Sequence, residues 1–222
     1  MSLRSTGKKI WNFLWHDDSF ASWIVSALLA FILVKFIIYP GLGLLLGTGY
    51  PVVAVVSGSM EHKSVPYGAG YTICGTITDG KDNYNFDEYW NACGQWYETN
   101  DITKDQFKDF KLHNGFNTGS IIVLRGATPE KIEVGDIIVF QDEAVCRIYG
   151  KCDPIIHRVV KISENNGERT FQTKGDHNSD SDVLEKDIKE NQILGKAVMK
   201  IPYLGYVKLL AVKLLNTISG GP

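Results

Sequence analysis

The chain opens with a polar stretch that is followed by a long apolar run with almost no charge. Residues 20–39 contain a single charged side chain, Lys35, among many large apolar ones. About twenty residues of helix cross a hydrocarbon core of about 30 Å, so this pattern predicts a transmembrane anchor over residues 19–40. Lys35 lies near one end, from which its ammonium group can reach the interface. Pro40-Gly41 is the expected end of the helix.

A removable signal peptide is the alternative interpretation of this run. Such a peptide has an apolar core of about 7–15 residues and a small-residue cleavage site. This run is longer, and no A-x-A sequence follows it, which favours a retained anchor. Arg4, Lys8 and Lys9 precede the run, so the positive-inside rule predicts a cytoplasmic N-terminus. Everything after residue 40 is then expected outside the cell or in the lumen of an organelle.

At residues 50–56, and densely from Gly119 onward, the pattern changes to short runs of β-branched residues separated by Gly, Pro, Asn and Asp turns. Strands are predicted at 50–56, 120–125, 136–141, 155–162, 170–174 and 193–201, with a short helix at 183–190. Strands spaced this closely favour an antiparallel sheet over βαβ units. The predicted fold class is therefore mainly β, with one N-terminal transmembrane helix.

The last predicted element is a short C-terminal amphipathic helix at residues 205–218. Apolar residues recur there at the spacing of one helix face, and Lys208 and Lys213 fall on the other face. Fourteen residues make about 21 Å of helix, which is too short to span a membrane. The helix is expected either to lie on the membrane or to pack on the domain or on another copy, and the sequence leaves both open.

Residues 61–115 differ in character from the β-rich remainder. They are rich in aromatic and acidic side chains and show no clear period, apart from a short helix suggested around 101–112. We predict an insertion over 61–115, within a β domain formed by residues 41–60 and 116–204. Residues 1–18 are the cytoplasmic head.

Four cysteines, Cys74, Cys93, Cys146 and Cys152, all follow the anchor. They lie in the part predicted to face an oxidising space, where disulfides persist. We favour the pairs Cys74–Cys93 and Cys146–Cys152, because closing a short loop costs the least entropy. Four free thiols are the alternative. A zinc site is disfavoured because no C-x-x-C pair is present.

Charge narrows the classes of partner. The net charge is −2, and basic and acidic residues are mixed along the chain. No basic block stands out, which argues against nucleic acid as a partner.

A hydroxyl, an imidazole and a carboxylate follow one another at positions that suit acyl transfer. Serine is a poor nucleophile without an adjacent base, and a histidine base needs a carboxylate to fix its tautomer. Ser59, His157 and either Asp176 or Asp182 offer this set. His62 is a competing base. Taken alone, a strand histidine is more often a hydrogen-bonded, half-buried side chain than a catalytic one.

Four short sequence boxes sharpen this interpretation. Ser57–His62 resembles the serine box of the type I signal peptidases, and three further segments resemble the later boxes of that family in the family's order. These segments are Gly135–Phe140, His157–Val160 and Lys174–Asn178. With the anchor, they cover most of the chain outside residues 61–115.

The resemblance implies roles for individual residues. Bacterial members pair serine with lysine, whereas the archaeal and endoplasmic-reticulum type has histidine there and adds an aspartate. His157 stands at that position, so the second type is implied, with Ser59 as nucleophile and His157 as general base. The essential aspartate falls six residues beyond Asp176, at Asp182, which leaves Asp176 as an accessory carboxylate and Asp180 as a near alternative.

The resemblance also implies an oxyanion site and shows two departures from the family pattern. The Ser57 hydroxyl and the backbone N–H of Ser59 are the implied donors, and no metal or cofactor is implied. His177 stands where the family usually has asparagine, and the insertion over 61–115 is longer than in compact relatives.

The implied function is a membrane-bound serine endopeptidase that removes signal peptides after small residues, in an A-x-A-like pattern, through an acyl-enzyme. Implied partners are preprotein signal peptides, the lipid bilayer and other secretion or peptidase subunits. The catalytic domain is expected outside the cell membrane or, alternatively, in the endoplasmic-reticulum lumen. A self-cleaving repressor is disfavoured by the anchor. The main alternative is a non-enzymatic membrane-anchored module that binds through residues 61–115, whose activity would survive Ser59→Ala.

Overall fold

The computed structural model describes residues 3–141 and 153–203. It divides into two compact units, whose boundary in the sequence lies between Gly49 and Tyr50. The predicted helix at 205–218 and the predicted Cys146–Cys152 bridge lie outside the described residues.

The N-terminal unit is helical. It contains α1 (Leu3–His16), α2 (Phe20–Leu33), a π-helical turn (Val34–Ile38) and α3 (Tyr39–Leu46). Ser19 caps α2, because its side chain accepts a hydrogen bond from the Ser22 backbone N–H at 3.3 Å. The Ser22 hydroxyl in turn donates to the Phe13 carbonyl, which ties α2 to α1.

The predicted anchor is a continuous helix of 27 residues, Phe20–Leu46, long and apolar enough to cross a membrane. The expected end at Pro40-Gly41 is wrong. The π-helical turn shifts the hydrogen-bond ladder just before the proline, with the Tyr39 N–H donating to the Val34 carbonyl. Pro40, which has no N–H to donate, is then tolerated near the start of the next segment. Gly47 ends the helix in a left-handed conformation, with φ of 66°.

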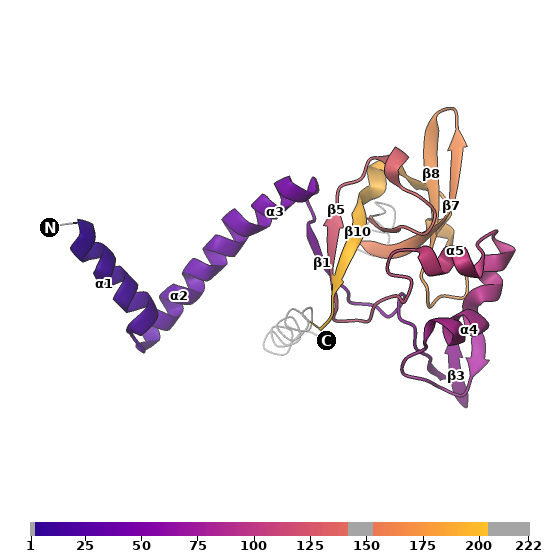
Figure 1. Ribbon diagram of the computed structural model, residues 1–222, viewed down its shortest axis with the longest axis horizontal. Coiled ribbons are helices and arrows are strands. Elements are labelled where there is room, and N and C mark those ends of the chain that lie inside the picture. Colours follow the sequence, from indigo (N-terminus) through magenta and orange to yellow (C-terminus); the bar gives the residue numbers. More distant parts are fainter. Residues whose placement is uncertain (1–2, 142–152, 204–222) are drawn as a thin grey trace. The chain divides into compact units, whose positions relative to one another are not determined.

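The second unit is built on a seven-stranded sheet with the strand order β1-β5-β10-β6-β7-β8-β9. In that order the strands are β1 (Val52–Ala54), β5 (Ile121–Arg125), β10 (Ile193–Ile201), β6 (Ile137–Phe140), β7 (Ile155–Asn165), β8 (Glu168–Lys174) and β9 (Ile188–Lys189). All adjacent strands pair antiparallel. The mainly β, antiparallel fold class predicted from the sequence is confirmed. Figure 1 shows β7 and β8 as a long hairpin that extends beyond the rest of the sheet.

Strand β6 shows why this part of the sequence is apolar at consecutive positions. Ile137 and Val139 pack into one core cluster, whereas Ile138 and Phe140 pack into another. Successive side chains of a strand point to opposite faces, so β6 is buried on both sides.

The insertion folds into a subdomain with its own sheet and helices. It contains β2 (Val65–Tyr67), β3 (Gly70–Ile73), β4 (Thr76–Thr78), α4 (Phe86–Thr99) and α5 (Lys104–Asp109). Cys74 and Cys93 form a disulfide that joins the β3–β4 turn to α4, as predicted. An aromatic core centred on Tyr89, Tyr97 and Phe107 includes Val160 of β7, which attaches the insertion to the main sheet.

Two elements differ from the sequence predictions. Helix α4 was missed, although Asn85 and Glu88 form a capping box at its start. The short helix predicted at 183–190 is wrong, because only a 3-10 turn, Val183–Glu185, is present before β9. Ile188 is buried and pairs with Phe171 of β8, so burial against the sheet decides the local conformation.

Candidate active site

Ser59 lies in a loop, residues 57–61, that follows the edge strand β1; we call it the serine loop. Directly after β1, the Val55 N–H donates to the Ser120 carbonyl at 2.9 Å, which extends the pairing of β1 with the chain leading into β5. The loop then turns back, with the Glu61 N–H donating to the Gly58 carbonyl at 3.0 Å. The His177 N–H donates to the Ser59 carbonyl at 2.8 Å, so the loop that follows β8 fixes the backbone of Ser59.

The two serine hydroxyls of the loop lie close together. Ser57 Oγ and Ser59 Oγ are 3.2 Å apart, within hydrogen-bond distance. Ser57 is exposed and Ser59 half-buried. The Ser57 hydroxyl is therefore placed beside the atom that would attack a carbonyl carbon, where an oxyanion donor is needed.

His157 is a buried residue of β7 whose direction is fixed by the strand. Its Nδ1 lies 2.7 Å from Glu185 Oε2, and the Thr173 hydroxyl donates to the same oxygen at 2.9 Å. Glu185 is itself 4% exposed. A carboxylate on Nδ1 fixes the tautomer that leaves Nε2 free to accept a proton. This Nε2 is the atom that a general base would use.

Gly175 marks the place where the serine loop and the histidine meet. A methyl group added to it would lie 2.7 Å from the Ser59 carbonyl oxygen and 2.9 Å from His157 Nε2. Both atoms therefore border one small space, although Ser59 and His157 come from distant parts of the sequence. A side chain at Gly175 would fill that space.

Asp176 directly follows Gly175 and lies in a buried polar network. Arg158 binds its carboxylate with two nitrogens, Nε at 2.9 Å and Nη2 at 2.7 Å. His62 Nε2 donates to it at 3.2 Å, and the Tyr97 hydroxyl donates at 3.3 Å. The Tyr89 hydroxyl donates to the Asp176 carbonyl at 2.8 Å. Asp176 thus joins the insertion to the main sheet.

The charges in this network stabilise one another. Burial alone would raise the pKa of Asp176, but the Arg158 guanidinium holds that pKa well below its usual range. Burial lowers the pKa of His62, against the opposing effect of Asp176. Its ring stacks on Tyr89 with centroids 3.6 Å apart. Its Nδ1 is buried and has no hydrogen-bond partner within the described residues.

Lys174 is a second buried basic residue, on the same face of the sheet as Arg158. Its Nζ donates to the Gly175 carbonyl at 3.0 Å and lies 4.8 Å from the centroid of the Tyr97 ring and 5.1 Å from that of Trp96. Burial lowers the pKa of Lys174 to about 8. Lys174 pairs across the sheet with Arg158, which follows His157, so it points to the face opposite His157.

The remaining predicted acids lie elsewhere. The exposed Asp182 carboxylate accepts a hydrogen bond from the Leu184 N–H at 3.1 Å and caps the 3-10 turn that carries Glu185. Asp180 accepts from Trp96 Nε1 at 3.0 Å. The structure thus brings together Ser57, Ser59 and His157, and places Glu185, rather than Asp182 or Asp176, against His157 Nδ1.

Sequence reasoning missed Glu185 and Arg158. Arg158 follows His157 directly in the chain, and an arginine flanked by apolar residues within a predicted strand was a signal that it needed a carboxylate partner. Glu185 had no such signal, because it lies in a segment that was expected to be helical. In the described parts of the chain, no group of three His, Cys, Asp or Glu side chains is arranged to hold a metal ion.

Comparison with known proteins adds an independent observation. The chain is 34% identical over 105 residues to the signal peptidase complex catalytic subunit SEC11C of Canis lupus familiaris, which is 45% of this chain and 52% of that protein. It is 36% identical over 100 residues to the putative subunit SEC11B of Homo sapiens, or 42% and 57% of the two chains. The matched part of this chain is homologous to signal peptidase catalytic subunits.

A fungal relative extends the comparison. The chain is 37% identical over 86 residues to the signal peptidase complex catalytic subunit SEC11 of Colletotrichum graminicola, or 36% of this chain and 46% of that protein. The chain spans about half the length of the curated relatives it matches. No family model matches the chain. The resemblance inferred from the four sequence boxes is confirmed by these relatives.

Proposed function

We propose that this protein is a membrane-bound serine endopeptidase that removes signal peptides from preproteins. The observation that carries the proposal is the meeting of Ser59 and His157 at Gly175, with a buried carboxylate behind the histidine. The homology to catalytic subunits of signal peptidase complexes supports the choice of substrate.

In the proposed reaction, His157 Nε2 takes the proton from the Ser59 hydroxyl while Ser59 Oγ attacks the scissile carbonyl. The protonated histidine then gives this proton to the leaving amine, and the acyl-enzyme remains on Ser59. Water, deprotonated by the same nitrogen, releases the signal peptide and restores the serine. The Ser57 hydroxyl and the Ser59 N–H are the proposed donors to the oxyanion.

We assign the orienting carboxylate to Glu185 rather than to Asp182. Glu185 is buried and lies 2.7 Å from His157 Nδ1, whereas Asp182 is exposed and already caps the turn that presents Glu185. Asp182 then acts on the site only through the position of Glu185. Asp176, bound by Arg158, serves the architecture of the loop that contacts Ser59.

The substrate is proposed to bind as an additional strand. β1 is the first strand in the sheet order, so its outer edge can accept an extended peptide that leads toward Ser59. Selection of small residues, in an A-x-A-like pattern, would come from shallow pockets that exclude larger side chains.

The membrane setting follows from the N-terminal unit. The helix Phe20–Leu46 would anchor the protein, and Arg4, Lys8 and Lys9 would keep its N-terminus in the cytoplasm. The catalytic domain would then face the cell exterior or, as an alternative suggested by the homology, the endoplasmic-reticulum lumen. The relatives are named as subunits of a complex, so further peptidase subunits are proposed partners.

Cleavage of a model preprotein tests the proposal. The purified full chain in detergent should release the mature protein, and Ser59→Ala and His157→Ala should each lower kcat by more than about 10³-fold. Ser64→Ala, at a buried serine in the insertion, is a matched control expected to retain activity. If Ser59→Ala cleaved at the wild-type rate, the protein would not be a peptidase of this type. If His157→Lys kept full activity, the assignment of histidine as the base would fail.

A further inference from the structure

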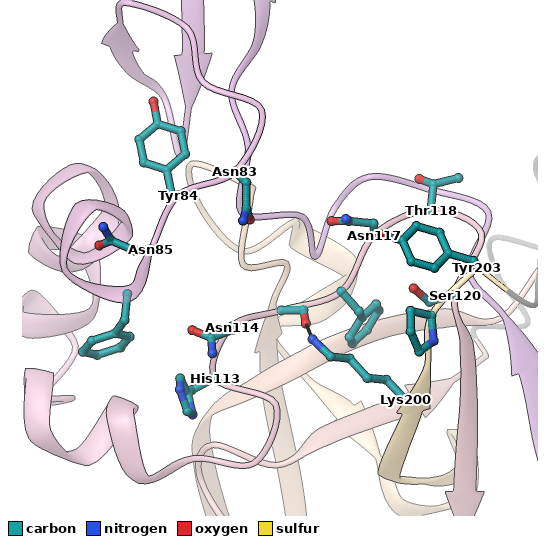
Figure 2. A pocket seen from close by; sticks show the side chains of 14 residues that line it. Asn83, Tyr84, Asn85, His113, Asn114, Asn117, Thr118, Ser120, Lys200 and Tyr203 are labelled. Carbon is teal, nitrogen blue, oxygen red and sulfur yellow. Dashed lines mark hydrogen bonds between the residues drawn. The ribbon is translucent and has the colours of Figure 1, made fainter.

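A cavity lies between the insertion and the end of the main sheet. It has a volume of about 490 Å³ and is lined by residues 83–86 and 113–118 of the insertion side, together with Ser120, Lys200, Pro202 and Tyr203. Figure 2 shows the Lys200 side chain crossing the middle of this pocket, with His113 and Asn114 on one side and Ser120 and Tyr203 on the other.

Lys200 is an uncompensated cation in this pocket. Its Nζ donates to the Gly115 carbonyl at 2.8 Å, and the described lining contains no carboxylate. Burial lowers the pKa of Lys200, as expected for an ammonium group that lacks an acidic neighbour. An ammonium has three donors, so Lys200 keeps donors for a ligand while it holds Gly115.

The rest of the described lining contains His113, polar side chains of asparagine, serine, threonine and tyrosine, and the apolar side chains of Phe86, Phe116 and Pro202. The side-chain amides of Asn83, Asn114 and Asn117 face the cavity with the Ser120 hydroxyl (Figure 2). Amide groups both donate and accept, which matches the alternating donors and acceptors of a peptide backbone. The pocket therefore suits a peptide segment that carries one negative charge.

The pocket shares a wall with the serine loop. The Phe116 N–H donates to the Met60 carbonyl at 3.0 Å, and the Thr118 N–H donates to the Glu61 carboxylate at 2.7 Å. Met60 and Glu61 directly follow the proposed nucleophile. The substrate segment before the scissile bond is proposed to run beside β1. The segment after that bond would then continue past Met60 and Glu61.

We propose that this pocket binds an acidic side chain in the mature part of the preprotein, a few residues after the scissile bond, with Lys200 as the residue that selects it. The inference rests on the proposed peptidase function and extends it to the released product. An extended chain advances about 3.3–3.6 Å per residue, so the second to about the sixth residue after the cut are the positions to examine.

The test uses paired model preproteins that differ only by Asp or Asn at each of these positions. For one position, the wild-type enzyme should show a KM about tenfold lower for the Asp substrate, with similar kcat, because a hydrogen bond to a charged group is among the stronger ones. Lys200→Met should abolish that preference by raising the KM for the Asp substrate to that for the Asn substrate, whereas Lys200→Arg should retain the preference. Lys161→Met, at an exposed lysine on β7, makes the same change in net charge and should keep the preference.

The outcomes separate this inference from the proposed function. Cleavage of both substrates without preference at any position would overturn the inference and leave the peptidase intact. An equal loss for both substrates in Lys200→Met would also overturn it. If no preprotein were cleaved, binding of the Asp and Asn peptides to Ser59→Ala, measured by fluorescence anisotropy, would still decide whether Lys200 selects the acid. Inorganic phosphate would serve as a competitor. If it abolished binding of both peptides equally, the pocket would be a general anion site, which would contradict a substrate site.

Discussion

At the scale of single residues, the site depends on a few side chains held by buried partners. Ser59 is fixed through its carbonyl by the His177 N–H, and His157 through Nδ1 by Glu185. Neither contact is made by a residue adjacent in sequence. Ser59 and His157 could be selected as candidates from the sequence, because they lie in boxes that resemble those of a known family. The identity of the carboxylate could not, because it depends on how a turn after β8 folds back over Thr173.

The choice between the two carboxylates can be measured. Glu185→Gln keeps the size of the side chain but stops it from stabilising the protonated histidine, so kcat should fall by about 10²–10⁴-fold. Asp182→Asn is the matched control and should lower kcat less than tenfold. The reverse order of effects would return the role to Asp182.

Gly175 offers a second test at this scale. Gly175→Ala would place a methyl group less than 3 Å from both the Ser59 carbonyl oxygen and His157 Nε2. We expect kcat to fall by at least tenfold while far-UV circular dichroism stays unchanged. Gly49→Ala, where an added methyl group meets nothing within 4 Å, should leave kcat as it is. Unchanged activity in Gly175→Ala would mean that this space is not the reaction centre.

At the scale of elements, the insertion braces the loop that holds Ser59. The Cys74 N–H donates to the His177 carbonyl at 2.9 Å, while the His177 N–H donates to the Ser59 carbonyl. Tyr89 and Tyr97 of α4 bind Asp176 in the same loop. The insertion was predicted as a disulfide-containing unit. Its position on the main sheet could not be predicted, because it depends on contacts of the α4 aromatic residues with Asp176 and Val160, which are distant in the sequence.

Loss of the disulfide should therefore affect stability more than chemistry. In the double variant Cys74→Ser, Cys93→Ser, the free energy of unfolding should fall by about 2–4 kcal/mol. Urea titration followed by tryptophan fluorescence would measure this change, and kcat at 20 °C should fall less than tenfold. An unchanged midpoint with unchanged slope would show that the crosslink does not stabilise the subdomain.

His62 gives the network a pH dependence. Its pKa is lowered in the folded protein, so below about pH 6.5 the unfolded chain binds more protons, and stability falls as the pH decreases. Asp176 does not oppose this between pH 5 and 6.5, because it stays ionised in both states. In His62→Gln, the free energy of unfolding should fall less steeply with decreasing pH, by up to about 1.4 kcal/mol per pH unit. Urea titration between pH 7.5 and 5 would measure this slope. His177→Gln, at a half-buried histidine whose pKa is also lowered, should leave the His62 contribution in place. An equally steep fall in His62→Gln would exclude it as the source.

At the scale of the whole molecule, one chain combines a helix able to cross a membrane with a β domain that carries a serine–histidine pair. Both could be predicted, because a long apolar run and dense β-branched runs are strong local signals. The end of the helix was misplaced at Pro40, since the π-helical turn that accommodates this proline has no simple sequence signature. The pocket around Lys200 could not be predicted either, because its lining comes from separate segments.

The most direct test of the account is covalent labelling of Ser59, the proposed nucleophile. A peptidyl fluorophosphonate with alanine next to the phosphorus should add one adduct to the full chain, and peptide mass spectrometry should locate it on Ser59. His157→Ala should lower the labelling rate by at least about 10²-fold, because Ser59 then lacks its base. A label on another residue, or equal labelling of wild type and His157→Ala, would contradict the account.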